Sequence, residues 1–352
     1  MLNFALVGCG RIAKRHAELL GFNQIKDACL KAVCDIDVKR AQSFGERFKV
    51  PFYTDMFEMM DKEKIDVVSV LTPSGLHARH VIGLTKYKKH IVVEKPMSLT
   101  LDDADAMIRA CDEAGIKLFV VKQNRYNYPV QKLRQALDEG RLGKIVLGTV
   151  RVRWCRDQKY YDQDSWRGKW NMDGGVFANQ ASHHIDLLEW LVGEAESVFA
   201  KSTTALVNIE VEDTGVVVVK FKNGALGVIE ATTAARPKDL EGSISILGEK
   251  GAVEIGGFAV NEMKVWNFSD PREEDKIILE KYRENPPNVY GFGHMAYLQH
   301  VTDAVINNQP ALVDGLEGRK SLELINAIYE SIETGKEVYL RFRPKKCRLG
   351  RL

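Results

Sequence analysis

The sequence lacks any long uninterrupted stretch of apolar residues. No segment approaches the roughly 18 uncharged residues that a membrane-spanning helix needs. The short apolar run at Met1–Cys9 has no basic leader of the kind that begins a signal peptide. We therefore expect a soluble, cytoplasmic protein with no membrane partner.

Clustered cysteines and an excess of charge are also absent. The six cysteines show no CxxC spacing, so the sequence indicates neither a zinc site nor a disulfide framework. Lys and Arg number 50 and Asp and Glu number 48, which gives a formal net charge of +2. This balance supplies no protein-wide field that would attract nucleic acid. We expect reduced thiols and no nucleic-acid partner.

The first third of the chain, to about Gln123, alternates short apolar runs with amphipathic stretches. The runs are typical of parallel strands buried on both faces, and they lie at Asn3–Gly8, Leu30–Asp35, Asp66–Leu71, His90–Glu94 and Lys117–Val121. The stretches between them have helical periodicity, at Ile12–Phe22, Val38–Phe48, Leu76–Tyr87 and Leu101–Ala114. This alternation predicts an α/β domain with a doubly wound parallel sheet over residues 1–123.

A different pattern follows Gln123. After a helix at Val130–Glu139, strand-like segments follow one another with glycine and asparagine turn signals between them: Lys144–Trp154, Ser197–Val207, Gly215–Phe221, Ala225–Thr233, Gly242–Leu247, Ala252–Ile255 and Ala259–Phe268. Helices are expected at Ala181–Leu191, His294–Asn307 and Leu316–Glu333. The pattern predicts a second, α+β domain over residues 124–340 with a mainly antiparallel open sheet. The basic tail at 341–352 has no apolar periodicity, so we expect disorder there rather than a nucleic-acid-binding arm.

A nucleotide fingerprint follows the first predicted strand. In "VGCGRIAKRH", Gly8, Gly10 and Ala13 fit the GxGxxG/A pattern, whose small residues let the backbone approach a pyrophosphate at a helix N-terminus. Asp35 ends the second strand, where its carboxylate can bind an adenosine ribose and repel the extra phosphate of NADP. The pattern favours NAD over a simple glycine turn, while S-adenosylmethionine in a methyltransferase is a rival ligand.

Two further strand ends carry polar residues. Thr72, Pro73, Ser74 and His77 follow the third run, and the "EKP" of Glu94–Pro96 follows the fourth. Because ligands of open α/β sheets bind at the carboxyl ends of the strands, these residues are expected at a cofactor crevice. Pro96 restricts the backbone of Lys95 to extended geometry. A charged EKP motif has no evident task in a methyltransferase, so it favours the dinucleotide.

These motifs together with "DGGVFANQASHHIDLLEWLVG" resemble the Gfo/Idh/MocA family of sugar and inositol dehydrogenases over nearly the whole chain. The resemblance implies a Rossmann domain for NAD(P), a second α/β domain whose open sheet commonly mediates oligomerisation, and a homotetramer. It implies that Lys95 and His183 lie at the reaction centre. The residues expected to bind the cofactor are Gly8, Gly10, Arg11, Ile12, Ala13, Asp35, Thr72, Pro73, Ser74, His77, Glu94, Lys95 and Gln123.

One position departs from the family pattern. Many members carry an aspartate four residues before the histidine, and here Asn179, which cannot act as a base, takes its place. A carboxylate relay at that position is therefore in doubt. Asp186, three residues after His183 and on the same helical face, is the remaining candidate.

Within the family, three segments, at 122–130, 151–170 and 178–186, are most similar to the WlbA/WbpB-type branch. That branch oxidises UDP-N-acetylglucosaminuronic acid at C3 of the sugar, in the synthesis of bacterial surface polysaccharides. Between Arg151 and Trp170 the chain supplies several basic side chains beside five aromatic ones, and they include Arg151, Arg153, Arg156, Arg167 and Lys169. Such side chains suit the anions and rings of this substrate, and solvated strand residues are the alternative. The residues expected to bind substrate are Lys95, Arg156, Tyr160, Tyr161, Arg167, Asn179, Gln180 and His183.

The expected chemistry removes a hydroxyl proton as hydride leaves for the nicotinamide. We expect His183 to take the proton and Lys95 to polarise the hydroxyl, with the reverse assignment open. Neighbouring histidines on a helix, such as His183 and His184, diverge by about 100° and do not naturally share an ion. His183 with Asp186 could, but only two ligands are visible, so no metal is expected. His16 and His77 are expected to form local hydrogen bonds, and Glu94 to steady Lys95 or approach the nicotinamide ribose.

Other functions stay open at this point. A free polyol or aldose such as inositol is the alternative substrate, although it lacks anions for the basic cluster. A non-catalytic NAD-binding sensor is the alternative of another class, and it would bind cofactor without turnover. The resemblance also implies, for some members, that a 2-oxo acid such as 2-oxoglutarate reoxidises NADH in place.

Overall fold

The computed structural model describes residues 1–282, 293–340 and 347–350 of the 352-residue chain. The chain divides into two compact units, Met1–Lys122 with His294–Arg319, and Gln123–Gly293 with Lys320–Leu352. A single boundary at residue 123 was expected, whereas His294–Arg319 returns to the first unit. The reason is a set of contacts there: Val120 donates its backbone N–H to the oxygen of Val313 at 3.1 Å, and Arg319 lies 2.5 Å from a carboxylate oxygen of Asp105.

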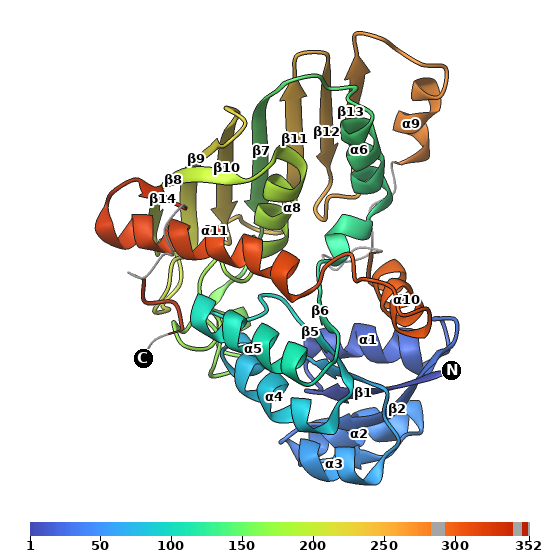
Figure 1. The fold of residues 1–352 in the computed structure, drawn as a ribbon. Helices are drawn as coiled ribbons and strands as arrows, with labels where there is room; N and C mark the ends of the chain where they lie inside the picture. The colour runs from blue at the N-terminus through green and yellow to red at the C-terminus, as the bar shows by residue number, and fades with distance from the viewer. Residues whose placement is uncertain (283–292, 341–346, 351–352) are drawn as a thin grey trace. The chain divides into compact units, whose positions relative to one another are not determined.

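The first unit is built on a six-stranded sheet, ordered β3-β2-β1-β4-β5-β6, in which every pairing is parallel (Figure 1). Its strands are β1 (Leu2–Val7), β2 (Ala28–Cys34), β3 (Phe52–Tyr53), β4 (Val67–Val70), β5 (His90–Val93) and β6 (Leu118–Val120). All four residues of β4 are buried, as expected for a strand covered on both faces. The doubly wound prediction is confirmed.

Helices connect these strands. They are α1 (Arg11–Gly21), α2 (Val38–Phe48), α3 (Met56–Lys62), α4 (His77–Leu84) and α5 (Leu101–Glu113). Most of α10 (Gly293–Ile306) also belongs to this unit, although it comes much later in the chain. The strand order reverses direction at β1, so right-handed crossovers place α1 and α2 on one face and α4 and α5 on the other. Side chains of Asp37, Asp55 and Thr100 accept backbone N–H groups at the starts of α2, α3 and α5, which fixes where these helices begin.

The second unit contains an eight-stranded sheet, ordered β13-β12-β11-β7-β10-β9-β8-β14. Its strands are β7 (Ile145–Arg153), β8 (Ala195–Thr203), β9 (Thr214–Phe221), β10 (Leu226–Thr232), β11 (Glu241–Gly248), β12 (Gly251–Gly256), β13 (Glu262–Phe268) and β14 (Val338–Tyr339). Among the described strands of this second sheet, the β7–β10 pair alone is parallel. The expectation of a mainly antiparallel sheet is confirmed.

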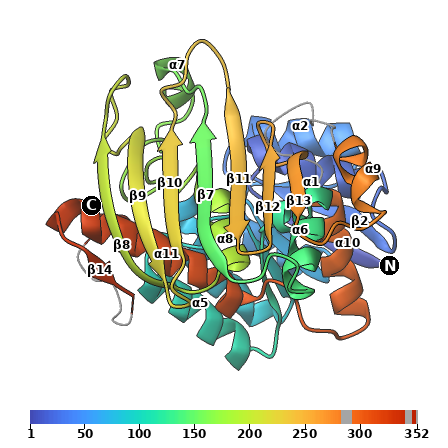
Figure 2. The same cartoon turned by 90° about the horizontal axis from the view of Figure 1, so that it is seen from above.

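Helices cover one face of this sheet, and Figure 2 shows α8 and α11 behind the strands. The helices of the unit are α6 (Tyr128–Asp138), α7 (Gln158–Tyr161), α8 (Ser182–Val192), α9 (Asp275–Lys281) and most of α11 (Gly315–Thr334). Helix α8 contacts β7 and β11. Gly148 makes the close approach to α8 possible, because a Cβ there would stand 2.6 Å from a methyl carbon of Val192. Helix α8 is thereby held firmly against the centre of the sheet.

The opposite face of the sheet is open, and two residues of the predicted basic cluster lie on it. Alternation along β7 buries Val150 and Val152 and turns Arg151 and Arg153 outward. Arg153 pairs with Glu230 at 2.6 Å, while Arg151 lies 3.3 Å from Glu241 across the strand pair. Arg151 and Arg153, two residues apart on β7, therefore lie on the same face of the sheet, where each pairs with a glutamate.

The C-terminal tail differs from expectation where it is described. Cys347 and Leu349 are buried, Cys347 lies beside Asn326, and the guanidinium of Arg348 lies 4.6 Å from the ring centre of Trp170. The disorder expected for the tail is wrong at 347–350, because those residues alternate apolar contacts with a cation–π contact. Residues 341–346 and 351–352 of the tail lie outside the described residues.

No described helix combines the length and the apolar composition required to cross a bilayer.

Candidate active site

The turn after β1 has the geometry that a dinucleotide requires. Gly8 has φ +100°, and a Cβ at that position would stand 2.8 Å from the backbone oxygen of Leu71, so only glycine fits. A Cβ on Gly10 would meet nothing within 4 Å, and Gly10 precedes α1 without a side-chain cap on the helix. Ala13 is buried in the first turn. Open space in front of uncapped helix N–H groups suits a pyrophosphate.

Asp35 stands at the carboxyl end of β2, beside this turn. One carboxylate oxygen accepts the backbone N–H of Cys9 at 2.7 Å, and the other accepts that of Asp37 at 2.9 Å. The carboxylate is thus fixed, and the next side chain, Ile36, is 94% exposed. A fixed acceptor and an uncovered apolar side chain suit a ribose and an adenine ring. Together with the turn, they show that the unit's own residues fit NAD.

His77 joins the ends of β4 and β5. Its Nδ1 lies 2.9 Å from the backbone oxygen of Pro96, and its Nε2 lies 2.7 Å from that of Thr72. Burial lowers the pKa of His77, so the ring is neutral and donates to one of the two oxygens at a time. Ser74 is buried and Pro73 half-buried in the same loop. His77 therefore holds the two crevice loops together, as expected for a local hydrogen-bonding residue.

Glu94 lies in a buried group of three side chains. Its Oε1 is 3.2 Å from Nε2 of His16 and 4.0 Å from Nε2 of His294, and its Oε2 accepts the backbone N–H of Lys95 at 3.0 Å. Burial alone would raise the pKa of Glu94, but the hydrogen bond from His16 and the nearby charges lower it to about 2. Glu94 is therefore an ionised carboxylate, and it holds Lys95 in position by accepting the backbone N–H of that residue.

His294 was missed from the sequence, because nothing in its local pattern marks a residue that returns to the first unit. Within the described part of the chain, His16, Glu94 and His294 form the one group of three ligand-type side chains within 4.8 Å of one another. The 3.2 Å separation of His16 and Glu94 is that of a hydrogen bond. We therefore describe the group as a hydrogen-bonded pair, His16 and Glu94, with the imidazole of His294 4.0 Å from the same carboxylate oxygen.

His183 lies in the first turn of α8, in the second unit, and is 7% exposed. The turn before the helix is ordered by Ser182, whose hydroxyl donates to the backbone oxygen of Asn179 at 3.0 Å. Gln180 is buried in the same turn, while Asn179 is half-buried. The amide of Asn179 donates to the carboxylate of Asp173. Three of the residues expected to bind substrate thus lie within one short segment.

Asp186, the remaining carboxylate candidate on α8, forms a buried ion pair with Arg125. Arg125 donates to both of its oxygens, from Nε at 2.8 Å and from an η nitrogen at 2.9 Å, and both side chains are buried. A buried carboxylate so engaged is held as the ion of a pair. Sequence reasoning missed Arg125, although an aspartate on a fully buried helix face signals that a cation must lie nearby. Gln123 lies in the same segment and is buried.

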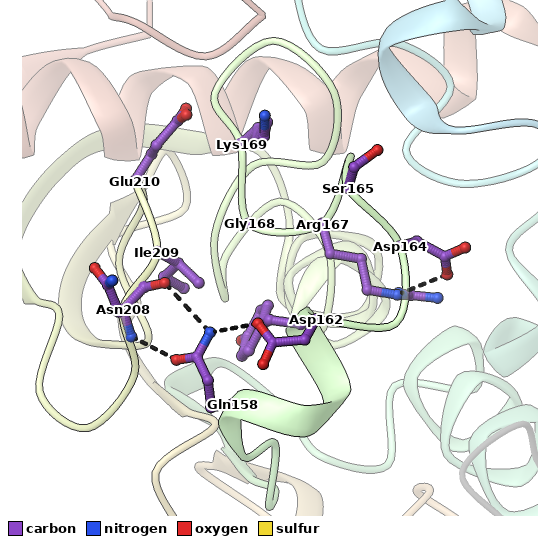
Figure 3. A pocket seen from close by; sticks show the side chains of 11 residues that line it. Gln158, Asp162, Asp164, Ser165, Arg167, Gly168, Lys169, Asn208, Ile209 and Glu210 are labelled. Carbon is purple, nitrogen blue, oxygen red and sulfur yellow. Dashed lines mark hydrogen bonds and ion pairs between the residues drawn. The ribbon is translucent and has the colours of Figure 1, made fainter.

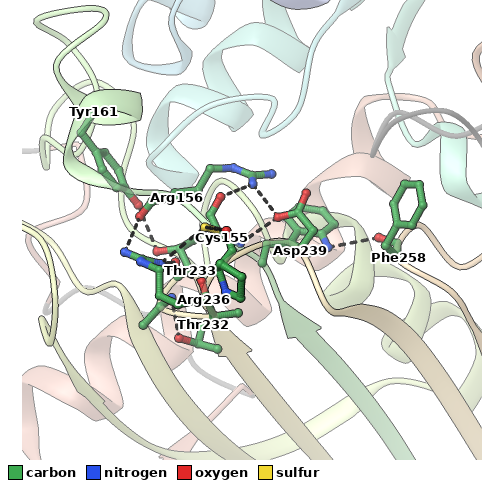
Figure 4. A network of polar contacts seen from close by, with 12 residues as sticks. Cys155, Arg156, Tyr161, Thr232, Thr233, Arg236, Asp239 and Phe258 are labelled. Atoms are coloured by element: carbon green, nitrogen blue, oxygen red, sulfur yellow. Dashed lines mark hydrogen bonds and ion pairs between the residues drawn. The ribbon is translucent and has the colours of Figure 1, made fainter.

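Arg156 is anchored in a polar network that Figure 4 displays. It donates to Asp239 at 2.8 Å and to the backbone oxygen of Cys155 at 2.6 Å, and Asp239 also accepts the backbone N–H of Cys155. Arg236 extends the network by donating to the backbone oxygens of Thr233 and Arg156. The guanidinium is thus held in one place.

Arg167 is similarly held. It donates to the hydroxyl of Tyr160 at 2.9 Å and to Asp164 at 3.2 Å, and it lies 4.4 Å from the ring centre of Trp166. Tyr161 is buried, its hydroxyl lies 3.2 Å from that of Thr233, and burial raises its pKa. The structure thus brings Arg156, Tyr160 and Arg167 together, since both guanidinium groups lie near the Tyr160 ring.

A cavity of about 360 Å³ opens beside Arg167 (Figure 3). Its walls come from two loops and α7, and they consist of Gln158, Tyr161, Asp162, Asp164, Ser165, Arg167, Gly168, Lys169, Asn208, Ile209 and Glu210. Gln158 crosses one wall, with hydrogen bonds to Asp162 and to the backbone of Asn208. The volume falls within the range of small-molecule sites, and most of the lining residues carry polar or charged side chains.

Comparison with known proteins agrees with these features. The pattern described as "Oxidoreductase family, NAD-binding Rossmann fold" matches residues 2–122, and that of the family's "C-terminal alpha/beta domain" matches residues 134–340. Myo-inositol 2-dehydrogenase of Thermotoga maritima is 31% identical over 96% of this chain and 98% of its own length.

Two solved structures are more similar in sequence. The WlbA dehydrogenase from Bordetella pertussis, in complex with NADH and UDP-GlcNAcA, is 41% identical over 96% of this chain and 98% of that chain, with a TM-score of 0.88. The WlbA dehydrogenase from Chromobacterium violaceum, with the same two ligands, is 44% identical over 96% and 95%, with a TM-score of 0.89. The chain therefore belongs to the Gfo/Idh/MocA oxidoreductase family and is an NAD-dependent dehydrogenase of the sugar type.

Proposed function

We propose that the protein oxidises the C3 hydroxyl of the sugar in UDP-N-acetylglucosaminuronic acid to a ketone, for the synthesis of bacterial surface polysaccharides. The observation that carries this proposal is the 41% and 44% identity to two dehydrogenases solved with that nucleotide sugar. The anchored pair Arg156 and Arg167 supports it, because guanidinium forks suit phosphate and carboxylate oxygens and a free polyol offers none.

In this proposal His183 and Lys95 act on the same hydroxyl. NAD supplies the hydride acceptor. His183 takes the hydroxyl proton because an unperturbed imidazole titrates near neutral pH, and Lys95 stabilises the developing alkoxide with its positive charge. Glu94 fixes the backbone from which Lys95 projects. The exchange of the two roles is the alternative within the same mechanism.

A free polyol is the second candidate substrate. The observation that favours it is the 31% identity to a myo-inositol 2-dehydrogenase over nearly the full length of both chains. An inositol has no phosphate or carboxylate that Arg156 and Arg167 could bind. Only the nucleotide sugar is therefore expected to need these two side chains for binding.

The direct test incubates the purified protein and NAD with UDP-N-acetylglucosaminuronic acid, UDP-N-acetylglucosamine or inositol, and follows both nicotinamide absorbance and the mass of the sugar. We expect loss of two hydrogens from the first compound alone. A parallel sample with 2-oxoglutarate detects recycling, because 2-hydroxyglutarate then forms without NADH release. Oxidation of inositol but of neither nucleotide sugar would refute the proposal.

The two reacting residues are tested by Lys95→Ala and His183→Ala. Loss of a positioned acid or base typically costs about 10²–10⁴-fold in rate, and we expect a fall in kcat of that size for each variant. Binding of NADH by fluorescence serves as the check on folding. Near-normal kcat in both variants would show that neither residue takes part in the chemistry.

A further inference from the structure

Asp173 is a buried carboxylate for which the proposed mechanism has no use. It is 1% exposed, and it lies between two segments of the candidate site. One oxygen accepts the backbone N–H of Gly168 at 3.1 Å, and the other accepts the side-chain amide of Asn179. Gly168 stands in the wall of the 360 Å³ cavity, and Asn179 stands one turn before His183. One carboxylate therefore connects the cavity loop with the turn that leads into α8.

The contact with Asp173 fixes the orientation of the Asn179 amide. An ionised carboxylate only accepts hydrogen bonds, so the NH2 group of Asn179 must face Asp173. The side-chain oxygen of Asn179 then takes the other position in the amide plane, away from the bond to Asp173. Asn179 is half-buried, so its side chain is not sealed in the interior. An asparagine amide can take either of two flipped orientations, and the contact with Asp173 selects the one in which the oxygen faces away from Asp173.

The same contact accounts for asparagine at this position. An aspartate at 179 would bring a second carboxylate against that of Asp173, and two carboxylates at hydrogen-bond distance do not both ionise. An amide satisfies the buried oxygen of Asp173 without this repulsion. The identities of residues 173 and 179 are therefore coupled: a carboxylate at the first requires a donor at the second.

We propose that Asp173 is a positioning residue that fixes the Asn179 amide so that its oxygen accepts a hydrogen bond from a hydroxyl of the substrate sugar beside the one His183 deprotonates. The inference rests on the proposed function for the class of substrate. Asn179 supplies an acceptor without a negative charge, and proton removal stays with His183. The bond from Gly168 ties this acceptor to the loop that carries Arg167 and Lys169.

The experiment compares Asp173→Asn, Asn179→Asp and the exchanged pair D173N/N179D, with kcat and KM measured from pH 5.5 to 9. We expect D173N to lower kcat/KM about tenfold or more, because two amides no longer define one orientation. N179D should lose more activity at pH 8 than at pH 6, since a proton shared between the carboxylates restores one donor. The exchanged pair should regain most of the loss, because it again holds one donor and one acceptor.

Asp213→Asn is the matched control. Asp213 is 1% exposed and accepts the backbone N–H groups of Ala205 and Leu206, so its substitution also removes a buried charge that binds backbone. We expect D213N to change the melting temperature without the pH effect of N179D. If D173N keeps wild-type kcat/KM, or if the exchanged pair is no better than either single variant, Asp173 has only a structural role and the inference is wrong.

Failure of the proposed function gives a different result. The assay of the wild-type protein on each compound identifies the substrate. The kcat/KM values of the variants, compared with the wild type on that substrate, test the role of Asp173. If inositol proves to be the substrate, the same four variants are compared on inositol. The Kd of the substrate, measured by calorimetry with NADH bound, provides a second readout, and D173N should raise it.

Discussion

At the scale of single residues, the two glycines of the nucleotide turn have separable tasks. Gly8→Ala forces a positive φ on alanine and places a Cβ 2.8 Å from the oxygen of Leu71, so we expect a loss of about 1–3 kcal/mol in the free energy of unfolding. Gly10→Ala meets no protein atom within 4 Å and should leave the melting temperature within about a degree. Its methyl group stands where the pyrophosphate approaches, so NADH should bind about tenfold more weakly.

Thermal unfolding and NADH fluorescence titration check this pair of variants. Equal melting temperatures for the two variants would contradict the assignment, and so would wild-type NADH affinity in Gly10→Ala.

Glu212 gives the stability of the second unit a pH dependence near neutrality. Burial raises the pKa of Glu212 to about 7, although hydrogen bonds from the Phe177 backbone and the Tyr329 hydroxyl oppose the rise. Because the folded-state pKa lies above the unfolded value, the contribution of Glu212 is fully present below about pH 4.3 and is lost as the pH rises through 7. The wild type should therefore lose more stability between pH 5 and 8 than Glu212→Gln.

Melting temperatures across that pH range measure the difference. Glu113→Gln, which removes an exposed carboxylate on α5, is the control and should follow the wild type. Parallel curves for the wild type and Glu212→Gln would show that Glu212 does not titrate in this range.

At the scale of elements, the buried pair Arg125 and Asp186 joins the short 3₁₀ helix at Gln123–Tyr126 to α8. Removal of one partner leaves an unpaired buried charge, so Arg125→Met should cost about 3–5 kcal/mol of unfolding free energy. The double variant R125M/D186L should recover part of this loss, because apolar side chains replace both charges. Urea unfolding measures both values. A loss below about 1 kcal/mol in R125M would contradict the buried pairing.

Periodicity predicted most of the elements because their apolar faces are continuous. Helix Val38–Phe48 was predicted with its observed bounds, and the strand at His90 was predicted to within a residue. The two-residue strand β3 and the four-residue helix α7 were not predicted, since neither is long enough to show a period. Short elements that form through contacts with segments distant in the sequence show no hydrophobic periodicity of their own.

The candidate site was predicted unevenly for the same reason. Motifs at strand ends located Gly8, Asp35 and Glu94, because the carboxyl edge of a parallel sheet gathers them. Long-range partners such as His294, Arg125 and Asp173 were invisible until the fold joined them. A count of basic residues could not show that Arg151 and Arg153 share one face of β7, because that depends on the two-residue period of the strand.

At the scale of the whole molecule, the open face of the large sheet is the surface for which we predict self-association. Val218 on β9 is 55% exposed, and its cross-strand neighbours Phe199 and Val228 are 40% and 36% exposed. An apolar stripe across three strands favours a covered interface over solvent. We therefore expect a homotetramer that uses this face, and Val218→Lys should shift the protein to smaller species in analytical ultracentrifugation.

Glu113→Lys, which changes a surface charge outside this sheet, is the control and should keep the wild-type assembly. A monomeric wild-type protein would contradict the prediction, as would an unchanged tetramer in Val218→Lys.

The central claim is that this chain oxidises a nucleotide sugar at C3. The measurement that tests it most directly is the mass and NMR spectrum of UDP-N-acetylglucosaminuronic acid after incubation with the enzyme and NAD. The account predicts a product lighter by two hydrogens with a carbonyl carbon at C3 of the sugar. Unchanged nucleotide sugar, in a preparation that binds NADH and oxidises inositol, would contradict it.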